Sequence, residues 1–130
     1  MVNALLGRIH LASRLFKLDE VRLALIKEGV AYYKTLVDVK KRALPYLPLG
    51  LTDFRQDRVA SGFMADGKLY LAVWYLKGDS TFSIDIPEGI KSVKLAYPLS
   101  SDTGVSFTEK ALSFEFKRRE GALFLEIELM

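Results

Sequence analysis

Two carboxylates and two aromatic rings occupy positions from which they could act on a sugar. Glu126 and Glu128 alternate with apolar residues in the last segment of the chain, so both carboxylates lie on one face of an expected strand. Paired carboxyl groups perform the acid–base chemistry of glycoside hydrolysis. Tyr70 and Trp74 share one face of an earlier expected strand, where their rings could stack on a sugar.

Structural roles are nevertheless favoured for all four residues. Because Glu126 and Glu128 alternate with core residues, we expect them on a solvated outer face of the sheet. The strand at residues 69–76 is apolar on both faces, so core packing is favoured for Tyr70 and Trp74. Sugar stacking by these two rings stays open as the alternative.

The remaining reactive residues are few. His10 is the single histidine, and Ser13 lies three residues away without an acidic residue that could orient the pair. The absence of cysteine excludes thiol catalysis, disulfides and zinc sites built on cysteine. Phosphate-binding loops, dinucleotide fingerprints and nucleophile elbows are also absent from the sequence. We expect no cofactor, no metal and no catalytic residue in this chain.

Apolar spacing predicts two helices at the start of the chain. Residues 3–16 form the first expected helix, because apolar residues recur there every three or four positions. The second begins after Asp19, a good N-cap, and runs to about Val39. A basic triplet at 40–42 follows, where a helix C-terminus favours positive charge.

After Gly50 the apolar period changes to two. Seven short strands are expected, at residues 58–64, 69–76, 81–86, 92–97, 105–107, 111–117 and 122–129. The predicted fold class is α+β, with an N-terminal helical segment followed by an antiparallel β-sandwich of about seven strands. The expected divisions are a helical segment at 1–44, a linker at 45–56 and the sandwich at 57–130.

Charge is divided unequally along the 130 residues. The first 50 hold nine Lys and Arg against four Asp and Glu, whereas the rest hold ten against twelve. No basic stripe interleaves with stacking aromatics, so a nucleic-acid module using the helical cations is disfavoured. No apolar run is long enough to span a membrane and no targeting signal is visible, so a cytoplasmic protein is expected. One Asn, one Gln and plentiful charge are thermophile-like.

The order of several segments resembles the C-terminal end of family 36 glycoside hydrolases, the α-galactosidases or melibiases. The matching segments are GRIHLAS at 7–13, EGVAYYK at 28–34, LPLGL at 47–51, YLAVW at 70–74 and the pair Tyr97-Pro98. The resemblance implies the last helices of a (β/α)₈ barrel followed by the C-terminal β-sandwich of a retaining exo-glycosidase.

The family's two catalytic aspartates lie in Lys-Trp-Asp and Ser-Asp-Asp segments of that barrel, and neither segment occurs here. Ser101-Asp102 lacks the second aspartate. The resemblance therefore implies a non-catalytic portion of an α-galactosidase-like enzyme, with a structural or oligomer-forming role. The alternative is a stand-alone carbohydrate-binding β-sandwich that takes galactosides.

Both expected helices are apolar over more than one face. They therefore require a partner surface, which is the β half of the chain, a second copy or a missing domain. The resemblance implies that such a missing domain is an upstream barrel. Without that barrel, we expect the chain to self-associate through residues 3–37 or to leave these helices poorly ordered.

Overall fold

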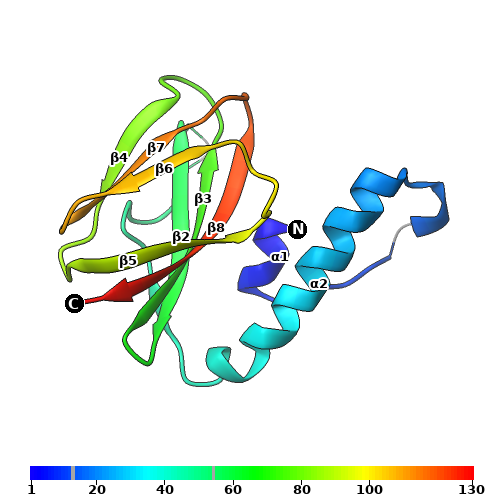
Figure 1. The fold of residues 1–130 in the computed structure, drawn as a ribbon, viewed down its shortest axis with the longest axis horizontal. Coiled ribbons are helices and arrows are strands. Elements are labelled where there is room, and N and C mark those ends of the chain that lie inside the picture. Colours follow the sequence, from blue (N-terminus) through cyan, green and yellow to red (C-terminus); the bar gives the residue numbers. More distant parts are fainter. Residues whose placement is uncertain (13, 54) are drawn as a thin grey trace.

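The computed structural model describes residues 1–12, 14–53 and 55–130 of the chain. Helix α1 (Val2–Leu6), a short 3₁₀ helix η1 (Leu15–Lys17) and helix α2 (Glu20–Lys40) come first. The strands that follow are β1 (Leu44–Tyr46), β2 (Arg58–Ala65), β3 (Lys68–Tyr75), β4 (Thr81–Asp85), β5 (Ile90–Tyr97), β6 (Gly104–Phe107), β7 (Ala111–Glu115) and β8 (Gly121–Leu129). The predicted α+β class with an antiparallel sandwich is confirmed (Figure 1).

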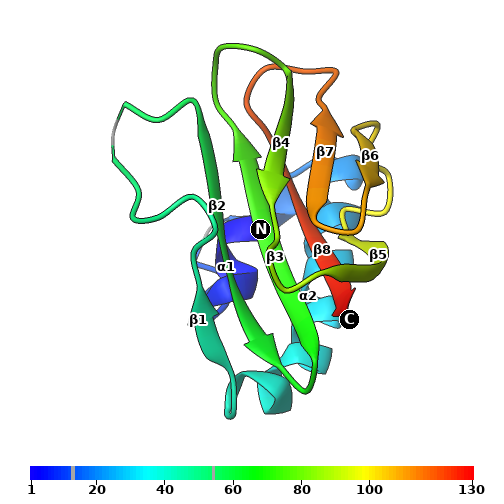
Figure 2. The same cartoon turned by 90° about the vertical axis from the view of Figure 1, so that its left-hand side faces the viewer.

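The strands form two sheets, and neighbouring strands are antiparallel throughout the described residues. One sheet has the order β1-β2-β3-β8-β5 and the other has the order β4-β7-β6. The two helices lie on the face of the larger sheet that points away from the smaller one (Figures 1 and 2). The molecule is therefore built of three layers, with the five-stranded sheet in the middle.

Two separate apolar cores hold these layers together. The first fills the sandwich and includes Leu71, Phe114 and Leu125. The second lies between the larger sheet and the helices, and it includes Leu5, Leu36 and other buried side chains. The larger sheet lies between these two cores, so its central strand β3 faces apolar side chains on both sides. This is why β3 is an almost continuous apolar run, as the sequence predicts.

Each of the seven expected strands is present, with ends within two residues of the expected ones. Their alternation predicts them well because one face of every strand lies in the first core. An additional short strand, β1, crosses the expected boundary between the helical segment and the linker. It pairs Leu44 with Met64 and Tyr46 with Gly62 at the edge of the larger sheet.

Helix α2 agrees with the prediction, and the Asp19 side chain accepts a 2.8 Å hydrogen bond from the backbone N–H of Arg22. The helix expected over residues 3–16 is wrong, because α1 ends at Leu6 and no helix is present at residues 7–12.

The reason is the distance that the chain must cover. The carbonyl of Gly7 accepts a hydrogen bond from Nζ of Lys40, which places the end of α1 beside the end of α2. From there the chain returns to the start of α2, roughly 30 Å away for a helix of this length. Thirteen residues in a helix would span only about 20 Å, whereas an extended chain spans more than 40 Å.

Candidate functional site

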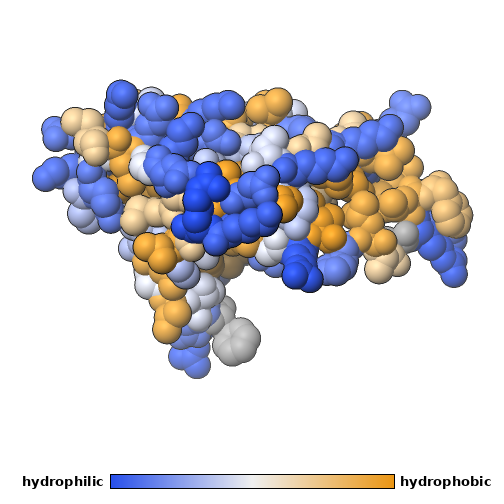
Figure 3. All heavy atoms as spheres, turned by 90° about the horizontal axis from the view of Figure 1, so that it is seen from below, coloured by the Kyte–Doolittle hydropathy of each residue, from blue (hydrophilic) through white to orange (hydrophobic). Residues whose placement is uncertain are grey.

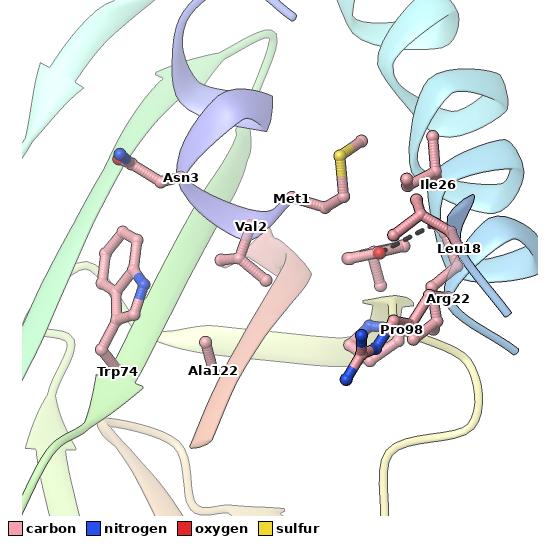
Figure 4. A pocket seen from close by; sticks show the side chains of 11 residues that line it. Met1, Val2, Asn3, Leu18, Arg22, Ile26, Trp74, Pro98 and Ala122 are labelled. Carbon is pink, nitrogen blue, oxygen red and sulfur yellow. Dashed lines mark hydrogen bonds between the residues drawn. The ribbon is translucent and has the colours of Figure 1, made fainter. Parts of the chain in front are cut away.

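A crevice of about 500 Å³ lies between α1, α2 and the helix-facing side of the larger sheet. Its lining is mostly apolar (Figure 4), and it includes Trp74 and Ala122 from the sheet and Ile26 from α2. Figure 4 shows Met1 and Val2 between these two walls. The crevice is therefore formed where the helix layer does not close completely on the sheet.

Of the two aromatic residues that the sequence offered for sugar stacking, Trp74 lines this crevice. Its side chain is half-buried, and it also lines a second hollow of about 430 Å³ together with Asn3 and Leu76. The ring therefore borders hollows of about the size that small ligands occupy. The side chain of Asn3 lies near it in Figure 4.

Tyr70 does not share this environment, although it is on the same face of β3. It is 7% exposed, and its ring stacks on that of Phe63 with 5.0 Å between centroids. Burial, followed by the charge of Glu126, raises the pKa of the Tyr70 hydroxyl. The structure thus places Tyr70 in the second core, where a sugar ring cannot reach it.

The two carboxylates of β8 have separate partners. Oε1 of Glu126 accepts a 2.8 Å hydrogen bond from the Tyr32 hydroxyl of α2, whereas Glu128 accepts one from Oγ of Ser92. Burial first, and then the hydrogen bond to Glu126, raise the pKa of Tyr32. The expectation of a solvated outer face is wrong for Glu126, because the helices cover this side of the sheet. Since each carboxylate is held by its own neighbour, the two do not form an acid–base pair.

A more polar hollow of about 460 Å³ lies at one end of the sandwich, beside the start of α2. Ser101 and Asp102, the pair that departs from the family's catalytic pattern, line it. Asp102 forms an ion pair with Arg118 at 3.3 Å, so its carboxylate already has a partner. Glu120 is the other carboxylate that lines this hollow, and it has no ion pair with a described residue, so the hollow offers one free carboxylate and not a catalytic pair.

The lone histidine and the acidic side chains are the remaining groups that could bind a metal or act on a substrate. His10 is exposed, and Ser13 lies outside the residues that the structure describes. No group of three or more acidic or histidine side chains in the described part of the chain could hold a metal ion. Neither of its α-helices combines the length and apolar character needed to cross a bilayer.

The side chains that fasten the helices to the sheet were not predicted from the sequence. The hydroxyl of Tyr97 donates a 2.9 Å hydrogen bond to the carbonyl of Leu25, and Glu28 accepts one from the backbone N–H of Leu99. Tyr32 adds the bond to Glu126. These partners are between 71 and 94 residues apart, so no local spacing pattern reveals them. The site is chemically suited to packing and binding, and it lacks a catalytic pair in its described residues.

Comparisons with protein-family models, with curated proteins and with solved structures found no match to this chain.

Proposed function

We propose that this chain is the non-catalytic C-terminal portion of an α-galactosidase-like retaining glycoside hydrolase, with a structural role in a cytoplasmic enzyme of carbohydrate metabolism. The observation that carries the proposal is the set of large apolar side chains that the helix layer still exposes, although the sheet already supplies one of the partner surfaces that the helices require. Phe16 is 84% exposed, Val21 is 72% exposed and Leu11 is 48% exposed. Figure 3 shows apolar atoms gathered around openings at the helical end of the molecule.

Exposed apolar side chains on the helix layer are typical of an interaction surface, although Leu44, Leu51 and Leu99 are exposed to a similar degree outside this layer. The order of segments resembles that in a family whose corresponding helices belong to a barrel domain. An upstream barrel is therefore the proposed partner, and it would carry the two catalytic carboxylates. Self-association through the helices is the second way in which this surface could be covered.

The lack of an acid–base pair among the described residues supports a non-catalytic role. Within the described residues, the two carboxylates considered for catalysis bind Tyr32 and Ser92, and Asp102 pairs with Arg118. The polar groups nearest to a catalytic arrangement are therefore engaged in holding the fold together.

The decisive experiment measures the mass of the native polypeptide in its source with an antibody raised against these 130 residues. The proposal predicts a band several times heavier than the 130-residue chain. It also predicts that the isolated chain does not hydrolyse melibiose. A band at the mass of 130 residues would overturn the proposal.

The alternative, a stand-alone sugar-binding sandwich, draws support from the position of Trp74 beside two hollows. It predicts that galactose or melibiose binds the chain and shifts the emission of its single tryptophan. Calorimetry with both sugars, repeated on Trp74→Phe, distinguishes this alternative from a purely structural role. Heat of binding that disappears in the variant would favour it.

A further inference from the structure

Helix α2 carries an apolar stripe that the sheet does not cover. Leu23, Val30 and Val37 recur every seven residues, so they lie nearly in line along one side of the helix. Leu23 and Val30 are half-buried, and Val37 is 42% exposed. By contrast, Gly29 and Leu36, which are also seven residues apart, are buried against the sheet side.

A row of lysines runs beside this stripe. Lys27, Lys34 and Lys41 follow the same seven-residue spacing, and all three are exposed. Lys41 is 2.7 Å from a carboxylate oxygen of Asp38. Lys27 and Lys34 have neither an ion pair nor a side-chain hydrogen bond to another described residue. Two unneutralised charges therefore lie along the edge of an apolar surface.

The segment between α1 and α2 adds to the same charge. It runs beside α2 in Figure 1, and its exposed residues include the cations Arg8, Arg14 and Lys17. None of these three cations has an ion pair within the described part of the chain. The helical layer as a whole is thus apolar and positively charged.

We propose that the α2 stripe, defined as Leu23, Val30 and Val37 with its edge of Lys27 and Lys34, binds an amphipathic helix with acidic residues beside its apolar seam. Heptad spacing lets apolar residues of a second helix pack between those of the stripe, and acidic residues at flanking positions then face the lysines. Lys27 and Lys34 attract a helix with acidic flanking residues and repel one with basic flanking residues, so charge selects the partner.

A second copy of this chain fits the stripe poorly. In an antiparallel pair of α2 helices centred on Val30, Lys27 of one copy lies beside the turn that contains Lys34 of the other. In a parallel pair, each lysine lies beside its equivalent. Like charges at such positions are destabilising, so both arrangements of two copies are disfavoured.

This inference is independent of the proposed function, because it concerns the charge and shape of one helix surface. The partner helix is assigned to another protein, and the charge of the stripe is what selects it. The mass of the native polypeptide therefore decides the proposed function without deciding this inference.

The test uses two synthetic peptides of three heptads each, with Ile and Leu at the seam positions. One carries Glu at the flanking positions and the other carries Lys. Calorimetry with the 130-residue chain should show binding of the Glu peptide and none of the Lys peptide. Raising the salt concentration should weaken the binding, since the selective contacts are charge pairs near the surface.

Variants then assign the binding to the stripe. The double substitution Lys27→Glu and Lys34→Glu should reverse the preference between the two peptides, and Val30→Asp should abolish binding of the Glu peptide. Lys110→Glu, at an exposed position between β6 and β7, is the matched control and should leave binding unchanged. Circular dichroism establishes that each variant retains its fold.

Several results would overturn the inference. They are equal binding of the two peptides, binding of neither, and a preference that the lysine reversal does not change. Sedimentation of the chain as a dimer that Val30→Asp dissociates would place a second copy on the stripe and would overturn it as well.

Discussion

The hydroxyl of Tyr32 on α2 donates a 2.8 Å hydrogen bond to Oε1 of Glu126 on β8, which joins residues 94 positions apart. The Tyr32 ring also lies edge-on to the ring of Phe124, with 5.8 Å between centroids. A polar contact and an aromatic contact thus fix the middle of the helix against the central part of the sheet. Tyr97 adds a third contact through its hydrogen bond to the carbonyl of Leu25.

Replacing Tyr32 with Phe removes the hydroxyl and keeps the ring. We expect the free energy of unfolding to fall by about 1–3 kcal/mol, because the half-buried Glu126 loses a hydrogen-bond donor. Tyr33→Phe is the matched control, since the adjacent hydroxyl makes no hydrogen bond to another described side chain. Denaturant titration of both variants measures the difference. An equal loss in the two variants would mean that the bond to Glu126 contributes nothing.

Leu36 and Val37 are neighbours on α2 with opposite environments. Leu36 is 1% exposed in the second core, and Leu36→Ala should cost about 2–5 kcal/mol of unfolding free energy. Val37 is 42% exposed, and Val37→Ala should change the stability by about 0.5 kcal/mol or less. Thermal unfolding of both variants measures this contrast. If the helices are poorly ordered in the isolated chain, Leu36→Ala will be as mild as Val37→Ala.

Gly62 allows β2 and β3 to approach closely. A Cβ at this position would clash with the backbone carbonyl of Tyr70 and would be 3.0 Å from Cα of Leu71. Because backbone atoms cannot turn aside as a side chain does, Gly62→Ala should cost about 3 kcal/mol or prevent folding.

Gly7→Ala serves as the control for this substitution. A Cβ at Gly7 meets no atom within 4 Å, so that variant should keep nearly full stability. Comparing soluble yield and unfolding midpoint for the two variants tests the claim. A stable Gly62→Ala variant would show that the two strands can separate at this point.

Four tyrosines should make the protein sensitive to alkaline pH. Burial is the largest cause that raises the pKa of the hydroxyls of Tyr32, Tyr46, Tyr70 and Tyr97. In the unfolded chain they ionise near pH 10, whereas the folded protein keeps them neutral to higher pH. Their contribution to stability is therefore complete below about pH 10, and it is lost as the pH rises through the folded-state pKa values.

Denaturant unfolding at a series of alkaline pH values measures this loss. Ultraviolet titration of native and unfolded protein should show that some tyrosines ionise later in the native state. Tyr32→Phe should reduce the slope of stability against pH. Identical titration curves for the two states would contradict the expected shift.

The sequence predicts the strands well and the helix layer only in part. Leu123 and Leu125 belong to the first core, so their alternation with other residues marks β8 clearly. Phe124, which lies between them, is buried in the second core. An alternating pattern with one apolar side suggests water on the other side, and it does not reveal that a helix covers Glu126.

The environments of the two candidate aromatic residues could not be predicted from the sequence either. Tyr70 and Trp74 have the same periodicity on β3, yet one is stacked on Phe63 and the other borders a crevice. The difference depends on where α1 lies above the sheet. Similarly, the end of α1 at Leu6 depends on the distance that the following residues must span, which apolar spacing does not encode.

The second core has a consequence for how this chain can be divided. A polypeptide that began at residue 57 would retain every strand from β2 onward but would lose α1 and α2. Phe63, Tyr70 and Phe124 would then face water from a sheet that the complete fold covers on both sides. Such a fragment should be prone to aggregation, so the sandwich should need the helices in the same chain to stay in solution.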